Sequence, residues 1–262
     1  MKNTIFGCLQ GAKILNDRVA VVTGSAAGIG RACAHLFARQ GAKLVLVDIN
    51  TEGINSVCND IKSFGGHAIT VDADITNEKD IAKVYQVTLE NYGRLNCLIN
   101  NAGGGLSTDF FDISIEEWNR VIALNLNSMF LMSQKAAVIF KEQRSGTMVN
   151  LSSIAGRSTS VTAGCHYTSA KAGILGLTRH MARQLAPYNV RVNAVCPGVT
   201  NSERLVKRME EKGTRKNVEQ SSPLGRIGDV YEIACSCLFM ASDMSSYITG
   251  ATLDVNGGAL MI

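Results

Sequence analysis

One stretch decides the fold of this chain: residues 18–30 read RVAVVTGSAAGIG. A short β-branched run ends in glycine at Gly24, and a helical pattern begins at Ile29 and closes at Gly41. The start of a helix presents unpaired backbone N–H groups and the positive end of the helix dipole, which suit a pyrophosphate. Glycines let the backbone turn tightly and approach the phosphates. The stretch therefore predicts a strand–turn–helix unit that binds a dinucleotide.

Strand and helix patterns alternate along the rest of the chain. We expect strands over 18–23, 43–47, 67–71, 94–99, 146–151 and 190–195, and helices over 29–40, 52–64, 77–92, 116–140, 167–185 and 231–240. Short apolar strands separated by helices are typical of a parallel sheet that is buried on both faces. Right-handed crossovers then predict an α/β fold, a single Rossmann-type, doubly wound parallel sheet in a three-layer αβα sandwich.

The chain shows no linker and no internal repeat, so we expect one domain over residues 16–262 behind a peripheral leader over residues 1–15. Composition shifts once, over residues 201–222, where the sequence is rich in charge and lacks a strong apolar stripe. This segment follows a strand end, where α/β folds place their ligands. We interpret it as a mobile lid over a substrate cleft; the alternative is a solvated pair of surface helices.

Composition argues against several classes of protein. The net charge is only +4 and aromatic residues make up 6%, so we expect no nucleic-acid partner. No stretch approaches the roughly 20 apolar residues of a membrane span, and we identify no signal peptide, which predicts a cytoplasmic protein without a membrane partner. The eight cysteines form no C-x-x-C pair, as in a reducing compartment, and no histidine spacing suggests a metal site.

An acidic residue follows the glycine turn at the distance that a dinucleotide requires. Asp48 lies 20 residues after Gly28, at the end of the second predicted strand. A carboxylate there can accept hydrogen bonds from both ribose hydroxyls. It would repel a 2′-phosphate, and no Arg or Lys occurs among residues 25–27 or directly after Asp48 to offset the repulsion. The sequence therefore predicts NAD(H) in preference to NADP(H).

A tyrosine and a lysine lie four residues apart at Tyr167 and Lys171, so they share one helix face. A phenol with a pKa near 10 is a poor base at neutral pH, but an ammonium and a positive nicotinamide nearby favour the phenolate and lower that pKa. Ser152 and Ser153 follow the fifth predicted strand and could hold a substrate oxygen. The spacing alone leaves an ordinary exposed helix pair open, because such pairs are common.

Taken together, these motifs resemble the classical short-chain dehydrogenase/reductase family over about residues 16–258. The matching motifs are T-G-x-x-x-G-I-G at 23–30, D-A-D-I at 72–75, N-N-A-G at 100–103, Asn125 in a long helix, S-S-x-x-G at 152–156, Y-x-x-x-K at 167–171, Pro197-Gly198 and the tail at 248–258. The resemblance implies an NAD(H)-dependent oxidoreductase that interconverts a secondary alcohol and a ketone by hydride transfer.

The resemblance also implies a role for each matching position. Tyr167 would move the proton, Lys171 would tune its pKa and hold the nicotinamide ribose, and Ser153 would polarise the carbonyl. Asn125 would hold a water that links Lys171 to solvent, although it could instead satisfy backbone groups in a bent helix. The expected cofactor contacts are Gly24, Ser25, Gly28, Ile29, Gly30, Asp48, Ile49, Asp74, Ile75, Asn101, Ala102, Gly103, Tyr167, Lys171, Pro197, Gly198, Val199 and Thr200.

Two of these positions keep alternatives. Asp74, expected to bracket the adenine together with Ile75, could also cap a helix or turn. Either Thr200 or Ser202 could meet the nicotinamide carboxamide, because the segment after Pro197-Gly198 places two hydroxyls near the family's usual threonine.

The positions expected around the substrate are small or apolar, which predicts a bulky, mostly apolar alcohol. They are Ser153, Tyr167, Gly104 and Ile154, together with Gly105, Leu106, Ala155, Thr162, Ala163 and the lid over residues 201–219. The run at residues 100–105 and the tail further resemble bacterial NAD-dependent hydroxysteroid dehydrogenases of the 7α type. We therefore expect a hydroxysteroid or bile acid, with a 3-oxoacyl-thioester reductase, a sugar or polyol dehydrogenase and a non-catalytic NAD sensor as alternatives.

The resemblance also implies a homotetramer or a dimer. The apolar helix expected over residues 231–240 and the apolar run at residues 259–262 support this expectation, since an apolar end left in water would be unusual.

Overall fold

One parallel sheet organises the molecule. In the computed structural model, which describes residues 11, 13–160 and 162–262, seven strands follow the order β3-β2-β1-β4-β5-β6-β7. Their bounds are Val19–Thr23 (β1), Lys43–Asp48 (β2), His67–Asp72 (β3), Cys97–Asn100 (β4), Gly146–Leu151 (β5), Val190–Pro197 (β6) and Thr252–Val255 (β7). All neighbouring strands are parallel. The strand order reverses between β1 and β4, and ligands of such sheets bind in the crevice that this reversal opens.

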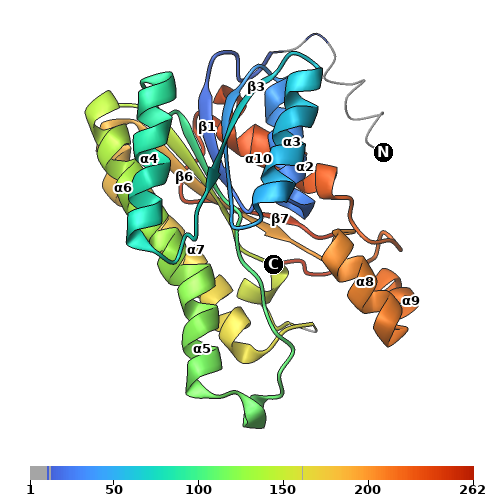
Figure 1. The fold of residues 1–262 in the computed structure, drawn as a ribbon. Coiled ribbons are helices and arrows are strands. Elements are labelled where there is room, and N and C mark those ends of the chain that lie inside the picture. Colours follow the sequence, from blue (N-terminus) through green and yellow to red (C-terminus); the bar gives the residue numbers. More distant parts are fainter. Residues whose placement is uncertain (1–10, 12, 161) are drawn as a thin grey trace.

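Helices cover both faces of the sheet and confirm the predicted three-layer sandwich (Figure 1). One layer contains α2 (Gly28–Arg39), α3 (Thr51–Ser63) and α10 (Val230–Ala241), and the other contains α4 (Glu78–Tyr92), α6 (Ser128–Gln143) and α7 (Cys165–Leu185). Three further helices lie at the carboxyl end of the sheet: α5 (Ile115–Ile122), α8 (Glu203–Lys212) and α9 (Arg215–Gln220). Within the described residues, the helices lack the combined length and hydrophobicity that crossing a membrane needs.

The two faces of the sheet divide the core according to the period-2 geometry of a strand. Val22 and Leu46 pack with the layer of α2, α3 and α10, whereas Val21 and Val45 pack with the layer of α4, α6 and α7. All four side chains are fully buried. The central strands therefore consist of continuous aliphatic runs, as a sheet covered on both faces requires.

The long helix predicted over residues 116–140 contains a local widening. Helix α5 passes into a π-helical segment, Ala123–Asn127, which continues directly as α6. The Nδ2 of Asn125 donates to the carbonyl of Val121 at 2.8 Å, inside this segment. Such π-helical turns occur frequently at functional sites. Here the turn directs the amide of Asn125 toward the loop that follows β4.

The structure corrects two details of the predicted organisation. Leu15, the last residue of the expected leader, is 1% exposed, packs into the core and donates its N–H to the carbonyl of Gln40. The domain therefore includes this residue, and residues 1–10 and 12 of the expected leader lie outside the described part. Strand β7 was not among the predicted strands. Its residues are only half-buried, and Thr252 and Asp254 interrupt the apolar pattern that identifies a buried strand.

Candidate active site

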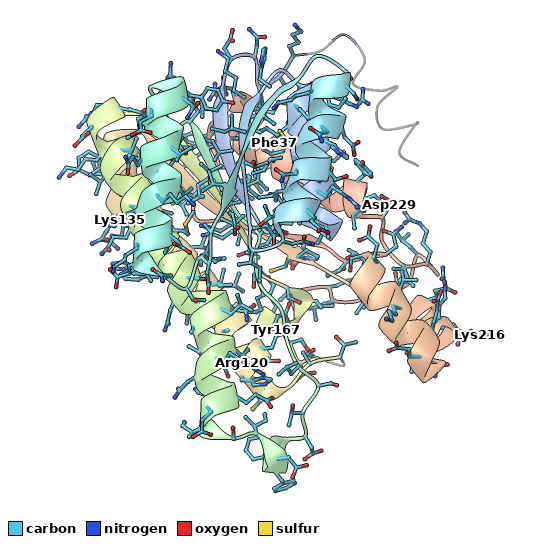
Figure 2. The ribbon with its side chains drawn as sticks, viewed as in Figure 1. Phe37, Arg120, Lys135, Tyr167, Lys216 and Asp229 are labelled. Atoms are coloured by element: carbon cyan, nitrogen blue, oxygen red, sulfur yellow. The ribbon has the colours of Figure 1, made fainter. Side chains whose placement is uncertain are left out.

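A cleft of about 1220 Å³ opens along the carboxyl ends of the strands. Its wall brings together the turn after β1, the ends of β2, β5 and β6, the start of α7 and the segment that contains α8 and α9. Figure 2 shows Tyr167 below this edge of the sheet, between α5, which carries Arg120, and α9, which carries Lys216. The segment predicted as a lid thus borders the cleft, through Leu205 of α8 and Val218 of α9.

The turn after β1 has the backbone that phosphate binding requires. Gly24 and Gly28 adopt positive φ angles of 65° and 53°, which favour glycine. A Cβ on Gly30 would lie 2.0 Å from the carbonyl oxygen of Gly24, so only glycine lets α2 begin so close to the turn. Ala27 at the N-cap carries only a methyl group and cannot cap the helix with its side chain. The first N–H groups of α2 are therefore suited to an anionic ligand.

Asn101 fixes this turn from the end of β4. Its Nδ2 donates to the carbonyl oxygens of Thr23 and Gly24, each at 3.0 Å. In return, the Thr23 hydroxyl oxygen accepts the backbone N–H groups of Asn101 and Ala102 at 3.0 and 3.1 Å. The N-N-A-G motif and the glycine turn thus form one hydrogen-bonded unit.

Asp48 points its carboxylate back at the glycine turn. Its two oxygens accept the backbone N–H groups of Ala26 and Asn50, at 3.1 and 3.0 Å. Each carboxylate oxygen has further acceptor capacity, which ribose hydroxyls could use. Asp74 lies on the same wall and also caps a turn, because its Oδ1 accepts the N–H and the hydroxyl of Thr76 at 2.8 and 2.7 Å.

Tyr167 and Lys171 lie side by side on α7. The Lys171 Nζ is 5.6 Å from the centre of the Tyr167 ring and donates to the carbonyl of Leu151 at 2.7 Å. Burial lowers the pKa of Lys171 to about 8, because desolvation penalises the charged ammonium. The pair is therefore not the exposed helix pair that the spacing alone left open.

The structure separates the two neighbouring serines. Ser152 is buried, and its hydroxyl donates to the carbonyl of Lys171 at 2.7 Å, so it supports the lysine from behind. Ser153 is half-buried on the cleft wall, at the start of the short 3-10 helix Ile154–Gly156. Its Oγ accepts the N–H of Ala155 at 3.1 Å, which leaves the hydroxyl proton available to donate. Both serines border the cleft, but Ser153 is the more exposed of the two, and its hydroxyl is the one whose proton is still available to donate.

Asn125 has its side-chain amide bound to the loop after β4. Its Oδ1 accepts the N–H of Gly104 at 3.0 Å, and its Nδ2 donates to the carbonyls of Gly104 and Val121, each at 2.8 Å. The side chain is fully buried. It thus satisfies backbone groups, the alternative that the sequence left open, and its link to a water stays a prediction.

Most of the predicted cofactor positions line the cleft, but Ser25 and Gly30 lie behind the wall that the described residues form, as does Asn125, which was predicted as a catalytic residue. Ser25 is fully buried and donates its N–H to the carbonyl of Val47 at 3.3 Å, so its place is structural. Among the predicted substrate positions, Leu106 also lies off the wall. Its carbonyl accepts the N–H of Gly164 at 2.7 Å.

Both candidate hydroxyls after Pro197-Gly198 border the cleft. Thr200 is 5% exposed, and its backbone forms a parallel bridge with Gly228. Ser202 begins α8, and its Cβ lies 3.3 Å from the position that a Cβ on Gly28 would take. Ser202 is therefore the hydroxyl residue that packs against the glycine turn.

One buried network behind the site and one contact of the lid were not predicted from the sequence. Below the site, a fully buried network joins the Asn100 Nδ2 to Ser133 and Asn150 at 2.9 Å each, and the Asn150 Nδ2 to Thr178 at 2.8 Å. The asparagines in the otherwise apolar strands β4 and β5 are its signal in the sequence. Glu203 lies within the predicted lid and borders the cleft, but the sequence held no signal for its contact with Arg31 of α2.

Comparisons with known proteins agree with this geometry. Residues 24–259 match the family model described as enoyl-(acyl carrier protein) reductase. The chain is 36% identical over 253 residues to a short-chain type dehydrogenase/reductase of Sinorhizobium fredii, covering 95% of this chain and 99% of that protein. It is 37% identical over 253 residues to the L-rhamnose 1-dehydrogenase (NAD(P)(+)) of Azotobacter vinelandii, covering 94% and 97%.

A 3-oxoacyl-(acyl-carrier-protein) reductase of Thermotoga maritima is 34% identical over 247 residues, with 94% of this chain and 99% of that protein covered. The crystal structure of a levodione reductase superimposes with a TM-score of 0.88 at 31% identity, covering 93% of this chain and 98% of that one. The chain therefore belongs to the short-chain dehydrogenase/reductase family of oxidoreductases.

Proposed function

We propose that this oxidoreductase interconverts a secondary alcohol and a ketone with NAD(H), and that Tyr167 is its acid/base. One observation carries the proposal: Tyr167, Lys171 and Ser153 border the same cleft as the glycine turn and Asp48. A dinucleotide with its pyrophosphate at the start of α2 and its ribose at Asp48 fits this wall. A nicotinamide, when bound, supplies the hydride acceptor or donor.

The side chains of the chain itself would manage the proton and the substrate oxygen. Tyr167 would take the hydroxyl proton of the alcohol, or return it to the ketone oxygen in the reverse direction. The Lys171 ammonium beside the ring favours the phenolate by its positive charge. The Ser153 hydroxyl would donate a hydrogen bond to the substrate oxygen and hold it next to the phenol.

The preference for NAD over NADP rests on the charges around Asp48. Among the described residues, the cations on the cleft wall are Lys171 and Arg226. Lys171 belongs to the catalytic group, and Arg226 is paired with Glu232 at 2.7 Å. A 2′-phosphate would thus meet the Asp48 carboxylate without a compensating cation.

A comparison of kcat/KM for the two cofactors tests this preference. We expect NAD to be favoured at least tenfold, which corresponds to about 1.4 kcal/mol of repulsion or lost hydrogen bonding. Asp48→Ala should reduce the ratio chiefly by raising KM for NAD. A wild-type protein that favours NADP would overturn the assignment.

The expected substrate is a bulky, mostly apolar alcohol of the hydroxysteroid or bile acid type. Ile154, Ala155 and Val199 on the cleft wall support this expectation, and the predicted lid adds Leu205 and Val218. A second candidate is a sugar or polyol. It is favoured by the hydroxyl side chains of Ser158, Thr159 and Ser160 on the same wall, and by the relative named as a rhamnose dehydrogenase.

A substrate panel followed by NADH absorbance separates these candidates. It should contain hydroxysteroids and bile acids, sugars and polyols, and 3-oxoacyl thioesters assayed in the direction of reduction. Turnover of sugars or polyols alone would reject the steroid proposal and keep the dehydrogenase chemistry. A protein that binds NAD but turns over no compound, with either cofactor, would instead be a sensor.

We also propose a homotetramer or dimer in the cytoplasm. Met244 and Tyr247 after α10, and Met261 and Ile262 at the end of the chain, leave more than half of each side chain exposed, as contact surfaces between subunits do. Light scattering tests the assembly, and a monomer at micromolar concentration would reject it. Cys58, Cys97 and Cys196 are buried and form no disulfide, in keeping with a reducing compartment.

A further inference from the structure

The residue before Tyr167 is a completely buried histidine whose two ring nitrogens both have partners. The Nε2 of His166 lies 2.8 Å from Oε1 of Glu117, and its Nδ1 accepts the backbone N–H of Tyr167 at 2.8 Å. An acceptor at Nδ1 and a carboxylate at Nε2 together assign the neutral tautomer with its proton on Nε2. Both hydrogen bonds therefore depend on the position and the protonation of this one ring.

His166 performs the task of a helix cap at the start of α7. Gly164 occupies the N-cap position and has no side chain to bind the first N–H groups of the helix. A Cβ on Gly164 would lie 2.8 Å from the Cε1 of His166, so the glycine leaves room for the ring. The ring then accepts the N–H of Tyr167 at 2.8 Å, a donor that the Gly164 carbonyl shares at 3.1 Å. The backbone that carries the phenol is thereby tied to the imidazole.

Glu117 connects this ring to α5 and to the loop after β4. It lies in the first turn of α5, where its N–H is capped by the Ser114 hydroxyl at 3.1 Å. Hydrogen bonds from Thr108 and from His166 hold the pKa of Glu117 below its usual value. Its side chain is 19% exposed. The carboxylate thus joins the start of α7 to Thr108, at the far end of that loop.

The same loop covers the ring of Tyr167. A Cβ on Gly105 would lie 2.8 Å from Cγ of Tyr167, so the loop backbone passes flat against the phenol. The loop is held at one end by Asn125 on Gly104 and at the other by Glu117 on Thr108. The ring is therefore fixed through its backbone by His166 and on its face by a loop that Glu117 anchors.

We propose that His166 and Glu117 are positioning residues for Tyr167. Their hydrogen bond would keep the phenol at its distance from Lys171 and Ser153, which rests on the proposed role of Tyr167 as acid/base. Displacement of a reacting group by about 1 Å can reduce turnover by roughly 100-fold. The alternative is a purely structural role, in which the buried histidine stabilises the fold without affecting the position of the phenol.

The first test uses His166→Ala, Glu117→Ala and the double variant. We expect kcat to fall 10- to 100-fold in each single variant, with the Kd for NADH changed less than twofold. The kcat of the double variant should be no lower than that of the less active single variant. Both substitutions remove the same coupled interaction, so their effects should not add. His166→Gln, whose amide can still donate to Glu117, should recover part of kcat. His180→Ala, which changes an exposed histidine of the same helix, is the matched control.

The second test needs no substrate, so it separates this inference from the proposed function. The phenol of Tyr167 is titrated by ultraviolet absorbance as the difference between each protein and its Tyr167→Phe counterpart. Wild type and His180→Ala should titrate alike, whereas His166→Ala and Glu117→Ala should shift the midpoint by at least half a pH unit. Unchanged midpoints in folded variants that bind NADH would overturn the positioning role. Absence of turnover in the wild type, with shifted midpoints, would overturn only the proposed function.

Discussion

The two halves of the cleft are built in different ways. The half that we propose for the pyrophosphate and the ribose at Asp48, here called the cofactor half, comes from consecutive segments, namely the glycine turn after β1 and the ends of β2 and β3, which supply Asp48 and Asp74. The substrate half collects Ser153, Tyr167 and Leu205 from segments that are far apart in the chain. A half made from local turns has its geometry set by nearby backbone hydrogen bonds. A half made from distant segments depends on what packs behind each of them.

The halves also differ in chemistry. The cofactor half presents carboxylates and backbone N–H groups, which recognise hydroxyls and phosphates by hydrogen bonding. The substrate half presents apolar side chains, hydroxyls and one buried ammonium. Changes in the cofactor half should therefore alter affinity for the dinucleotide, whereas changes in the substrate half should alter kcat.

The largest effect is expected for Tyr167→Phe, which removes only a hydroxyl from the substrate half. Loss of the acid/base should reduce kcat by about 10²–10⁴-fold. The Kd for NADH, measured by fluorescence titration, should stay within a factor of two. A variant that keeps wild-type turnover would break the division between the halves, because the proton would have to move through another group.

The next effect concerns Lys171 and the stability of the fold. Its pKa is lowered by burial from 10.5 to about 8 in the folded protein. Between these values the unfolded chain binds a proton that the folded protein does not, so the free energy of unfolding rises with pH across this window. The gain is about 3 kcal/mol. Below pH 8 Lys171 is charged in the folded and the unfolded protein, and the whole of this contribution, about 3 kcal/mol, is lost from the free energy of unfolding.

Urea denaturation of the wild type and of Lys171→Met at several pH values measures this contribution. The stability of the wild type relative to the variant should rise from pH 8 to pH 10.5, since only the wild type carries the titrating amine. Subtracting the free energy of unfolding of the variant from that of the wild type removes the contributions of titrating groups that both proteins share. A constant difference across that window would show that Lys171 is not desolvated as its burial indicates.

Gly105→Ala should act on the substrate half alone. The added methyl group would lie within 3 Å of the Tyr167 ring and of the Ala163 Cβ, so the ring or the loop must move. We expect kcat to fall about 10- to 50-fold, less than for removal of the hydroxyl, through misplacement of the phenol. Affinity for NADH should be unchanged in a fluorescence titration.

Gly176→Ala is the matched control on the same helix as Tyr167. A Cβ there meets nothing within 4 Å, and alanine favours a helix over glycine by about 1 kcal/mol. Its kcat should equal that of the wild type, and its Tm should rise slightly. Equal losses of kcat in both glycine variants would indicate a general perturbation of α7 instead of a contact with Tyr167.

The smallest effect is expected where the lid touches the cofactor half. Glu203 in the first turn of α8 pairs with Arg31 of α2. Burial raises its pKa, but backbone N–H groups, that of Gly28 among them, and Arg31 outweigh this and bring the pKa below its usual value. We therefore expect this carboxylate to compete with a pyrophosphate for the start of α2.

Glu203→Gln should lower KM for NAD about two- to fivefold, as expected for a charge of about 0.3–1 kcal/mol at a helix N-terminus. The effect should weaken as ionic strength increases. Glu219→Gln is the control, because this carboxylate on α9 pairs with Arg215 and not with the glycine turn. Asp229→Asn would not serve, because Asp229 caps α10. An unchanged KM in Glu203→Gln would show that the lid does not compete for this site.

The sequence alone was sufficient for the alternation of strands and helices, for the glycine turn and for Asp48. Each of these depends on a short segment whose backbone conformation its own residues impose. Positive φ at Gly24 and Gly28, or a buried aliphatic run between two turns, needs no partner from elsewhere in the chain. The spacing of Tyr167 and Lys171 is equally local, since one helix places both on one face.

Only the tertiary structure decided which polar side chains meet. The His166–Glu117 hydrogen bond joins residues 49 positions apart, and the half-buried β7 joins the sheet through its pairing with β6. Ser152 and Ser153 both border the cleft and differ in burial and in hydrogen-bond partners. Burial and hydrogen-bond partners depend on the packing of distant segments, and no local pattern of apolar and polar residues encodes that packing.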